Sequence, residues 1–324
     1  MLVVCRDIIG PMDLSRRSLL ASPAILIGCR RSPAVRIAIF RGEEFTPLAK
    51  SLGYFAAEGL EVEISEVAST PKAMQALFGD SADVVTGGYD HAIHLAAEGR
   101  RARSFIVLTT RSPLALVASR IRRIEDLKGA TVGISGFGSS GQHFVNYLLH
   151  RHGLTDKDVK FAITGGGHGV TVASIEHNRL DAIVTLPPSL AILRARMPGL
   201  VILADGTSVE GAREVFGVDQ YPAIAMMAQA DWIGAHRDTV AGLARAMRKT
   251  LGWVRAHSAE ELQQQLRNRA GQPEELEGLR ATIASCSPDG RMPAGGPEAV
   301  REMLAATYPA IRSLDLNSTY TSSF

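Results

Sequence analysis

Residues 136–141 of the chain read Gly-Phe-Gly-Ser-Ser-Gly and run directly into a predicted helix at 142–152. The first amides of a helix have no hydrogen-bond partner within it, and the helix dipole places positive charge at the same end. Gly138 lets a ligand approach the backbone closely, and Ser139 and Ser140 add hydroxyl donors. The loop therefore indicates a subsite for an anionic or strongly hydrogen-bond-accepting group, with ordinary helix capping as the alternative.

Two earlier loops carry side chains that could complete such a site. Arg41 follows a predicted strand and could pair with an anion, while Phe45 could pack against a carbon skeleton; the alternative is a solvated charged loop. In the segment Gly87–His91 the glycines allow close backbone approach, and Tyr89 offers a ring and a hydroxyl. The alternative there is a tight turn in which Asp90 caps a helix.

Two later loops could form the opposite wall of the site. The glycine run 165–167 suits close backbone approach, and His168 follows it; a flexible turn with a surface or capping histidine is the alternative. The segment 185–189 could complete that wall. Together the loops supply the candidate ligand-binding residues Arg41, Phe45, Gly88, Tyr89, Asp90, His91, Gly138, Ser139, Ser140, Gly167, His168, Thr185 and Pro187.

The sequence contains no recognisable catalytic arrangement. The patterns HExxH and GxSxG are absent, and Cys286 has no histidine at a supporting spacing. His91 and His94 lie three residues apart and could share one face of a helix, but no carboxylate or cysteine supports them as a metal site. We therefore expect no catalytic residues, no metal and no cofactor.

The elements that position these loops are those of an α/β fold, because predicted strands and helices alternate along the chain. Several helices are expected to begin at a cap followed by proline, as at Thr46-Pro47 and Thr70-Pro71. Ligands of open α/β sheets bind beyond the carboxyl ends of the strands, where these loops are expected to lie. Short apolar or alternating runs predict strands at 35–40, 60–65, 83–86, 105–109, 114–118, 131–134, 160–163, 182–185, 200–203 and 222–228.

The first thirty residues predict export from the cytoplasm. Arg16 and Arg17 precede the short apolar run 19–27, which is typical of a signal peptide and resembles a twin-arginine signal. Leu-Ile-Gly before Cys29 resembles a bacterial lipobox, in which the cysteine becomes the lipidated N-terminus. The run is too short to span a bilayer. We expect residues 1–28 to be removed and Cys29 to carry a membrane anchor; a plain hydrophobic N-terminal segment is the alternative.

Composition narrows the remaining possibilities. Of 324 residues, 46% are hydrophobic and 21% charged, so a packed core is available and disorder is not expected. The net charge is only +2 and the arginines are scattered, which argues against a nucleic-acid partner. Cys5 and Cys29 lie in the predicted signal, so Cys286 alone cannot form an internal disulfide. The expected molecule is a soluble body on a lipid tether.

Five phrases of the chain occur in the order found in one family of transport proteins. Each phrase is followed here by the family pattern that it matches. The phrases are Ser51–Val62 (GYFxxEGLxVE), Ala76–Asp83 (ALxxGxAD), Gly87–His91 (the first ligand loop), Ile124–Gly133 (IxDLKGxTVGV) and Gly138–Ser140 (GSS). Over residues 35–260 the chain thus resembles the solute-binding proteins of ABC importers. Within these proteins, the chain resembles the nitrate/sulfonate/taurine-type branch, which is related to thiamine-pyrimidine precursor binders.

The resemblance implies a periplasmic-binding-protein fold of type II, with two α/β lobes joined by a two-strand hinge. The first lobe is expected at 34–117 plus 224–324 and the second at 118–223. It further implies a monomeric, non-enzymatic periplasmic receptor that captures a small, anionic molecule such as a sulfonate, nitrate, taurine or a related organic acid. Its partners would be an ABC permease and the ATPase subunit.

The chain also departs from the family pattern, and other functions stay open. His143 stands one place later than the histidine or aromatic that often follows the GSS loop, and Leu186-Pro187-Pro188-Ser189 lacks the usual tryptophan. A binder of pyrimidine or aromatic precursors is one alternative. An enzyme on the same fold, of the thiamine-pyrimidine or menaquinone-pathway type, is another. A LysR-type effector domain would need a DNA-binding N-terminus, where an export signal is predicted instead.

Overall fold

The computed structural model describes residues 34–165, 168–266 and 273–324. The predicted signal peptide 1–28, Cys29 and Gly167 therefore lie outside the described residues. Residues 33–324 form one compact unit, which contains two five-stranded sheets. None of the helices described is both long and apolar enough to cross a membrane.

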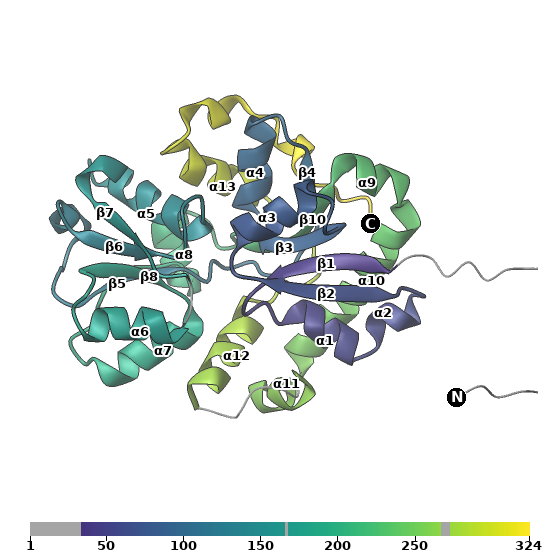
Figure 1. Ribbon diagram of the computed structural model, residues 1–324, viewed down its shortest axis with the longest axis horizontal. Helices are drawn as coiled ribbons and strands as arrows, with labels where there is room; N and C mark the ends of the chain where they lie inside the picture. The colour runs from purple at the N-terminus through teal and green to yellow at the C-terminus, as the bar shows by residue number, and fades with distance from the viewer. Residues whose placement is uncertain (1–33, 166–167, 267–272) are drawn as a thin grey trace, which may run out of the picture. The chain divides into compact units, whose positions relative to one another are not determined.

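The first sheet has the strand order β2-β1-β3-β10-β4 (Figure 1). Its strands are β1 (Val35–Phe40), β2 (Val62–Val67), β3 (Val84–Gly88), β4 (Ala102–Val107) and β10 (Ile224–Gln229). β1 pairs in parallel with β2 and β3, while β10 runs antiparallel between β3 and β4. The carboxyl ends of β1, β2 and β3 therefore meet at one edge.

The second sheet repeats this plan with the order β7-β6-β8-β5-β9. Its strands are β5 (Ala115–Ala118), β6 (Thr131–Ile134), β7 (Lys160–Ile163), β8 (Ala182–Thr185) and β9 (Val201–Asp205). β6 pairs in parallel with β7 and β8, and β5 is antiparallel to β8 and β9. We call each sheet with its helices the first and the second α/β unit.

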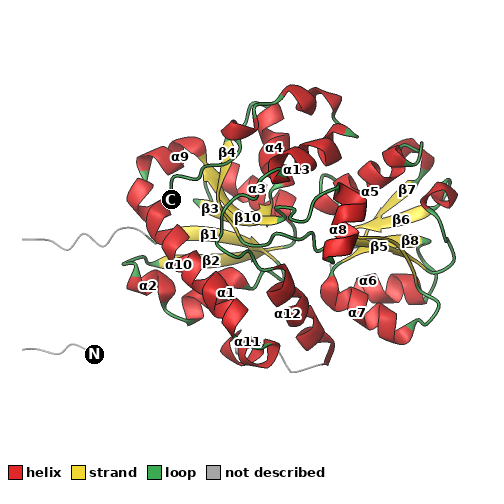
Figure 2. Ribbon diagram, turned by 180° about the vertical axis from the view of Figure 1, so that it is seen from behind, coloured by secondary structure: helices red, strands yellow, loops and turns green. Residues whose placement is uncertain are grey.

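Helices cover both faces of the two sheets (Figure 2). Those of the first half are α1 (Phe45–Ser51), α2 (Tyr54–Ala57), α3 (Thr70–Phe78), α4 (Asp90–Ala97), α5 (Ser140–Arg151) and α6 (His168–Glu176). The later ones are α7 (Pro187–Arg196), α8 (Val209–Phe216), α9 (Ala230–Ala235), α10 (Arg237–Ala256), α11 (Ala259–Leu266), α12 (Pro273–Ser285) and α13 (Gly296–Ala305).

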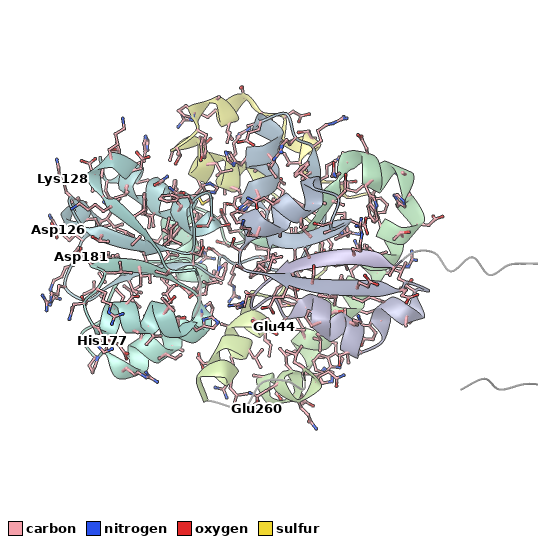
Figure 3. The ribbon with its side chains drawn as sticks, in the orientation of Figure 1. Glu44, Asp126, Lys128, His177, Asp181 and Glu260 are labelled. Atoms are coloured by element: carbon pink, nitrogen blue, oxygen red, sulfur yellow. The ribbon has the colours of Figure 1, made fainter. Side chains whose placement is uncertain are left out.

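The strands are apolar on both faces because each sheet is buried between helices. In β1, Ile37 packs in the cluster formed with α1 and α10, and Ala38 packs on the opposite side with α3 and α4. The α3 side of this core continues into the second unit through Phe144 of α5 and Leu116 of β5. Charged side chains such as Lys128 and Glu260 lie on the outer surface (Figure 3).

The chain crosses between the units twice. Residues 108–114 lead from β4 to β5, and residues 206–223, which include α8, lead from β9 to β10. The two crossings run side by side, since the amide of Tyr221 donates to the carbonyl of Thr110 and that of Ala223 to the carbonyl of Thr109. The expected pair of α/β units is confirmed. The two crossings were expected to be strands, but they lie outside the named strands.

One expected boundary needs correction. The first lobe was expected to extend to residue 117, but β5 (Ala115–Ala118) pairs with β8 and β9 of the second sheet. The sequence pattern identifies β5 as a strand. Which sheet it joins depends on its pairing partner β8, which lies more than 60 residues later in the chain.

The loop between β1 and α1 is anchored by a buried carboxyl group. Glu43, only 3% exposed, accepts hydrogen bonds from the amides of Phe45 (2.8 Å) and Thr46 (3.1 Å). These amides stand at the start of α1, where they have no acceptor within the helix. Burial raises the pKa of Glu43 to about 7, and the neighbouring Glu44 adds to this, although the two amide bonds oppose it. The loop that carries Arg41 is thus held by a group that titrates near neutral pH.

This arrangement predicts a stability that depends on pH. The pKa of Glu43 is higher in the folded protein (about 7) than in the unfolded chain (about 4.5), so the folded state binds more protons in this interval. The contribution is complete below pH 4.5 and is lost as the pH rises through 7. Glu43→Gln stays neutral and keeps an acceptor oxygen. As the pH rises from 5 to 8, its free energy of unfolding should therefore increase relative to that of wild type.

The expected gain is on the order of 1 to 3 kcal/mol, measured by urea denaturation at the two pH values. Glu61→Gln, at an exposed position on the same unit, is the control and should track wild type. Parallel pH profiles for wild type and Glu43→Gln would contradict the assignment.

Candidate functional site

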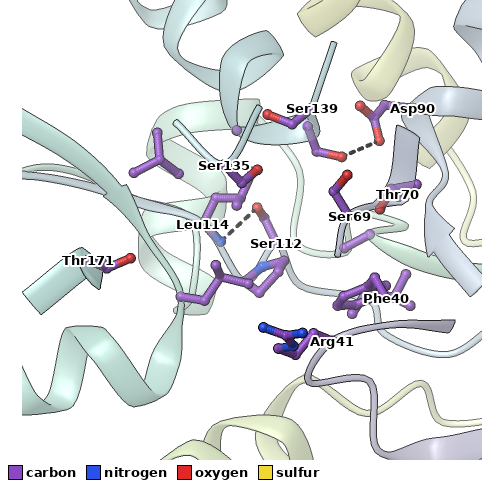
Figure 4. Close-up of a pocket in the computed structure, with 18 of the residues that line it drawn as sticks. Phe40, Arg41, Ser69, Thr70, Asp90, Ser112, Leu114, Ser135, Ser139 and Thr171 are labelled. Atoms are coloured by element: carbon purple, nitrogen blue, oxygen red, sulfur yellow. Dashed lines mark hydrogen bonds between the residues drawn. The ribbon is translucent and has the colours of Figure 1, made fainter. Parts of the chain in front are cut away.

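A cavity of about 130 Å³ lies between the two units, beside the crossing segments (Figure 4). Both units line it with side chains at the carboxyl ends of their strands. Serine and threonine side chains line much of it, and we call it the hydroxyl cavity; they are Ser69, Thr70, Ser112, Ser135, Ser139, Ser140, Thr164 and Thr171. Apolar surface comes from residues such as Phe40, Leu114, Val184 and Met303.

A second cavity of about 280 Å³ adjoins the first and shares Phe40, Arg41, Pro113 and Leu186 with it. We call it the α12 cavity because Leu279, Thr282 and other residues of α12 line it. Helix α12 follows β10 in the chain but packs against α7 of the second unit. The two adjoining cavities together offer space for one elongated small molecule.

The carboxylate of Asp90 joins the two units at the hydroxyl cavity. It stands at the start of α4 in the first unit and is 4% exposed. Its Oδ1 accepts from Ser140 Oγ (2.8 Å) and lies 3.1 Å from His91 Nδ1, and its Oδ2 lies 2.7 Å from His143 Nδ1. Ser140 and His143 belong to α5 of the second unit. Three polar side chains from two elements thus converge on one buried carboxylate.

This cluster holds charge despite its burial. Burial by itself would raise the pKa of Asp90, but His91 and His143 hold it well below its ordinary value. Burial opposes a charge on His91, yet the Asp90 carboxylate and the carbonyls of Gly88 and Gly138 raise the pKa of His91 overall. Burial and the neighbouring His143 lower the pKa of His94, one turn further along α4. Both shifts favour the charged forms of Asp90 and His91, which lie 3.1 Å apart.

Aromatic packing closes the cluster on the side of α13. The ring of Tyr308, which follows α13, stacks on His94 with centroids 4.5 Å apart and meets His143 edge-on at 5.9 Å. His143 is 1% exposed and does not line either cavity. The sequence left His143 open as a ligand contact; the structure places it behind Asp90 as a partner of the carboxylate.

The start of α5 has the predicted capping geometry. Ser139 is the N-cap, and its Oγ accepts from the amide of Gln142 at 3.3 Å. The side-chain oxygen of Gln142 in turn accepts from the amide of Gly138 (2.7 Å). Gly138 has a φ of +72°, which glycine adopts without strain. Ser139 and Ser140 both line the hydroxyl cavity, so capping and access to a ligand occur together.

Two candidates of the 87–91 segment point away from the cavities. Tyr89 is fully buried, and its hydroxyl lies 2.5 Å from Thr319 Oγ1. His91 is buried behind Asp90 and is not among the residues that line the cavities. Gly88 and Asp90, the alternate positions, do line the hydroxyl cavity. Asp90 is the first residue of α4 and its side chain makes no capping bond, so the capping alternative is not what the structure shows.

Arg41 and Phe45 reach the cavities in different ways. Arg41 lines both cavities, but its side chain is 64% exposed and its guanidinium pairs with Glu66 at 3.0 Å. Phe45 lines the α12 cavity and is 2% exposed, so it forms part of the wall. The Arg41 cation at the rim is therefore already paired with a carboxylate in the first unit.

The later loops of the second unit contribute predicted residues to the α12 cavity. His168 and Pro187 line the α12 cavity, and His168 Nδ1 lies 2.9 Å from Ser189 Oγ. Thr185 is fully buried and lines neither cavity, whereas Val184 and Leu186 on either side of it do. Side chains alternate between the two faces of a strand, which accounts for Thr185 at the end of β8.

Several lining residues were not predicted. Ser69 is the N-cap of α3 and Thr70 its first residue, shortly after β2 ends, and the rule that ligands lie beyond strand ends could have identified them. Ser112 and Tyr221 come from the two crossings, which carry no pattern that marks them as part of a site. Thr282 of α12 reaches the site only through packing against the second unit.

The arrangement does not resemble a catalytic triad. A nucleophilic serine needs a hydrogen bond to the imidazole that takes its proton, whereas Ser140 donates to the carboxylate of Asp90. In the part of the chain that the structure describes, no three histidine, cysteine, aspartate or glutamate side chains are grouped to hold a metal ion.

The hydrogen bond between Asp90 and Ser140 occupies the place that a side chain at position 88 would take, so only glycine fits there. A Cβ at this position would fall on both Asp90 Oδ1 and Ser140 Oγ, well inside contact distance. Gly88→Ala should break this bond and lower the free energy of unfolding by about 1 to 3 kcal/mol. Gly136→Ala is the control, since its Cβ would meet open space and it should stay within about 0.5 kcal/mol of wild type in urea denaturation. Equal stability of both variants would argue against a tight contact at Gly88.

The comparisons with known proteins identify the family and the fold. The family model described as NMT1/THI5 like matches residues 45–261. Among curated proteins, "Putative binding protein YtlA" of Bacillus subtilis (strain 168) is 24% identical over 67% of this chain, and the match spans 65% of that protein.

Solved structures agree with this assignment. A protein of Bordetella bronchiseptica RB50 is 28% identical with a TM-score of 0.80, covering 90% of this chain and 96% of that one. The periplasmic aliphatic sulphonate binding protein SsuA of Escherichia coli has a TM-score of 0.67 at 18% identity, covering 89% and 92%. The expected periplasmic-binding-protein fold of type II is confirmed. The chain belongs to the NMT1/THI5-like family.

Proposed function

We propose that this protein is the solute-binding receptor of an ABC importer. The observation that carries the proposal is a cavity lined at once by both α/β units and by the two crossing segments. A ligand held there contacts both units, so it favours whichever arrangement of the units makes both sets of contacts. Capture of the ligand would then be reported to a permease and its ATPase subunit through the shape of the receptor.

Two further points support binding without chemical conversion. The similar proteins are named for binding, in one case of aliphatic sulphonates. In this chain, the cavity serine that contacts a charged group donates to Asp90, whose pKa lies well below its ordinary value, so its partner is a weak base. The ligand proposed from the sequence is a small anion such as a sulfonate, taurine, nitrate or organic acid. A pyrimidine or aromatic precursor is the alternative, and the adjoining α12 cavity has room for the carbon skeleton of an organic molecule.

A panel of small molecules tests the proposal. Residues 34–324 would be mixed with alkanesulfonates, taurine, nitrate, aromatic carboxylates and pyrimidines, and melting would be followed. A ligand at a hundredfold excess over its Kd should stabilise the protein by about 2.7 kcal/mol.

The control is a variant with a filled cavity. Ser69, an extended N-cap residue in the wall of the hydroxyl cavity, would be changed to Trp, and Ser69→Trp should abolish the shift. Ser81→Trp, at an exposed position beyond the other end of α3, should retain it. A shift that survives in Ser69→Trp would place binding elsewhere, and no shift with any compound class would count against a receptor.

We also propose that the protein is exported, by the twin-arginine route, to the periplasm and anchored by a lipid on Cys29. The residues before Cys29, together with the periplasmic location in the name of the E. coli protein, support this. Cys29→Ser in the full-length chain should move the protein from the membrane pellet to the soluble periplasmic fraction. Cys286→Ser, at a buried position, is the matched control and should stay in the pellet. A wild-type protein found wholly in the soluble fraction would exclude the anchor.

A further inference from the structure

The hydrogen of the Ser140 hydroxyl is committed to Asp90. Ser140 Oγ lies 2.8 Å from Asp90 Oδ1 and is the donor in that bond. An ionised carboxylate has no hydrogen to give, so it acts only as an acceptor. The imidazoles of His91 and His143 must likewise direct their Nδ1 hydrogens at this carboxylate, since their Nδ1 atoms lie 3.1 and 2.7 Å from it. Every group around Asp90 therefore points a hydrogen toward it.

The consequence at the cavity is an acceptor surface. A hydroxyl carries one hydrogen and two lone pairs, so Ser140, which has given its hydrogen to Asp90, can only accept from a ligand. Asp90 itself lines the cavity beside it and also only accepts. This reverses the donor role that the sequence predicted for Ser140.

Ser139, the residue before Ser140, offers a hydrogen-bond donor to the cavity instead of an acceptor. Ser139 Oγ accepts from the amide of Gln142, so its own hydrogen is available to donate into the cavity. The amides of Ser140 and Gly141, in the first turn of α5, have no partner within the helix and add further donors on this side. The start of α5 thus presents donors and acceptors side by side.

We propose that this subsite takes a group that carries an N–H donor beside an acceptor atom, as in an amide, a sulfonamide or an amino-substituted heterocycle. The donor would face Ser140 and Asp90, and the acceptor would face Ser139 and the first amides of α5. A fully ionised sulfonate or carboxylate would place oxygen lone pairs against those of Ser140 and Asp90. The inference rests on the proposed receptor function. Of the ligand classes named there, it favours amino-substituted heterocycles over ionised sulfonates and carboxylates.

Butane-1-sulfonamide and butane-1-sulfonate are a suitable probe pair, because they differ only in an NH2 group in place of O⁻. A site with committed acceptors discriminates against a partner that cannot donate to them. The wild-type protein should bind the sulfonamide at least tenfold more tightly than the sulfonate, as measured by calorimetry at pH 7. Ser140→Ala should reduce this ratio severalfold, and Ser140→Thr, which keeps the hydroxyl, should restore it.

The matched control is Ser139→Ala. It removes a donor and leaves the acceptors in place, so it should weaken both probes and keep the ratio at or above the wild-type value. Asp90→Asn replaces the acceptor-only group by an amide, which lets Ser140 donate, so the sulfonate should gain relative to the sulfonamide.

A measurement without ligand tests the bond polarity even if Asp90→Asn does not fold. NMR titration of the Asp90 carboxyl carbon should give a higher pKa in Ser140→Ala than in wild type, because a donor to the ionised form is lost, and little change in Ser139→Ala. An unchanged pKa in Ser140→Ala, or a wild-type preference for the sulfonate, would overturn the inference and leave the receptor function standing. Failure of the probes and of the whole small-molecule panel to bind would remove the proposed function, and this inference with it.

Discussion

A buried carboxylate needs hydrogen-bond donors around it, and the region between the two units is arranged to supply them to Asp90. Removing a charge from water costs several kcal/mol unless donors or an opposite charge replace the solvent. Here the donors come from Ser140 and His143 of one unit and from His91 of the other. The position of α5 relative to α4 is therefore set by the requirements of one side chain.

Other features around the site follow from this constraint. Gly88 has no side chain because a Cβ would occupy the place of the Asp90–Ser140 bond. His143 is buried and stands edge-on to Tyr308, so the cluster extends to the segment after α13. The polarity of the cavity wall also follows, since the direction of each hydrogen around Asp90 decides which atoms remain to meet a ligand. A charge buried for structural reasons can in this way select the chemistry of a binding site.

The two cavities are formed by different parts of the chain. The hydroxyl cavity is formed by loops that follow strands, and those loops are fixed by sheet pairing and by caps such as Ser139. The α12 cavity depends on a C-terminal helix that packs against α7 of the other unit. A helix that contacts both the site and the second unit couples the size of this cavity to the arrangement of the units.

Local pattern was sufficient for most of the architecture and for one loop of the site. Alternating strands and helices and the glycine-serine loop 136–141 act over a few residues, so they could be predicted from the sequence. The expected caps Thr46 and Thr70 were wrong by one or two residues, because the N-caps of α1 and α3 are Glu44 and Ser69. What pattern did not determine depended on distant partners. Strand β5 joined the second sheet through pairing with β8, Thr185 turned away because side chains alternate along β8, and Asp90 became a buried acceptor only when α5 approached it. The sequence by itself determined which elements form, whereas the tertiary structure decided which atoms face the ligand, because hydrogen-bond direction depends on neighbours that the chain brings together only by folding.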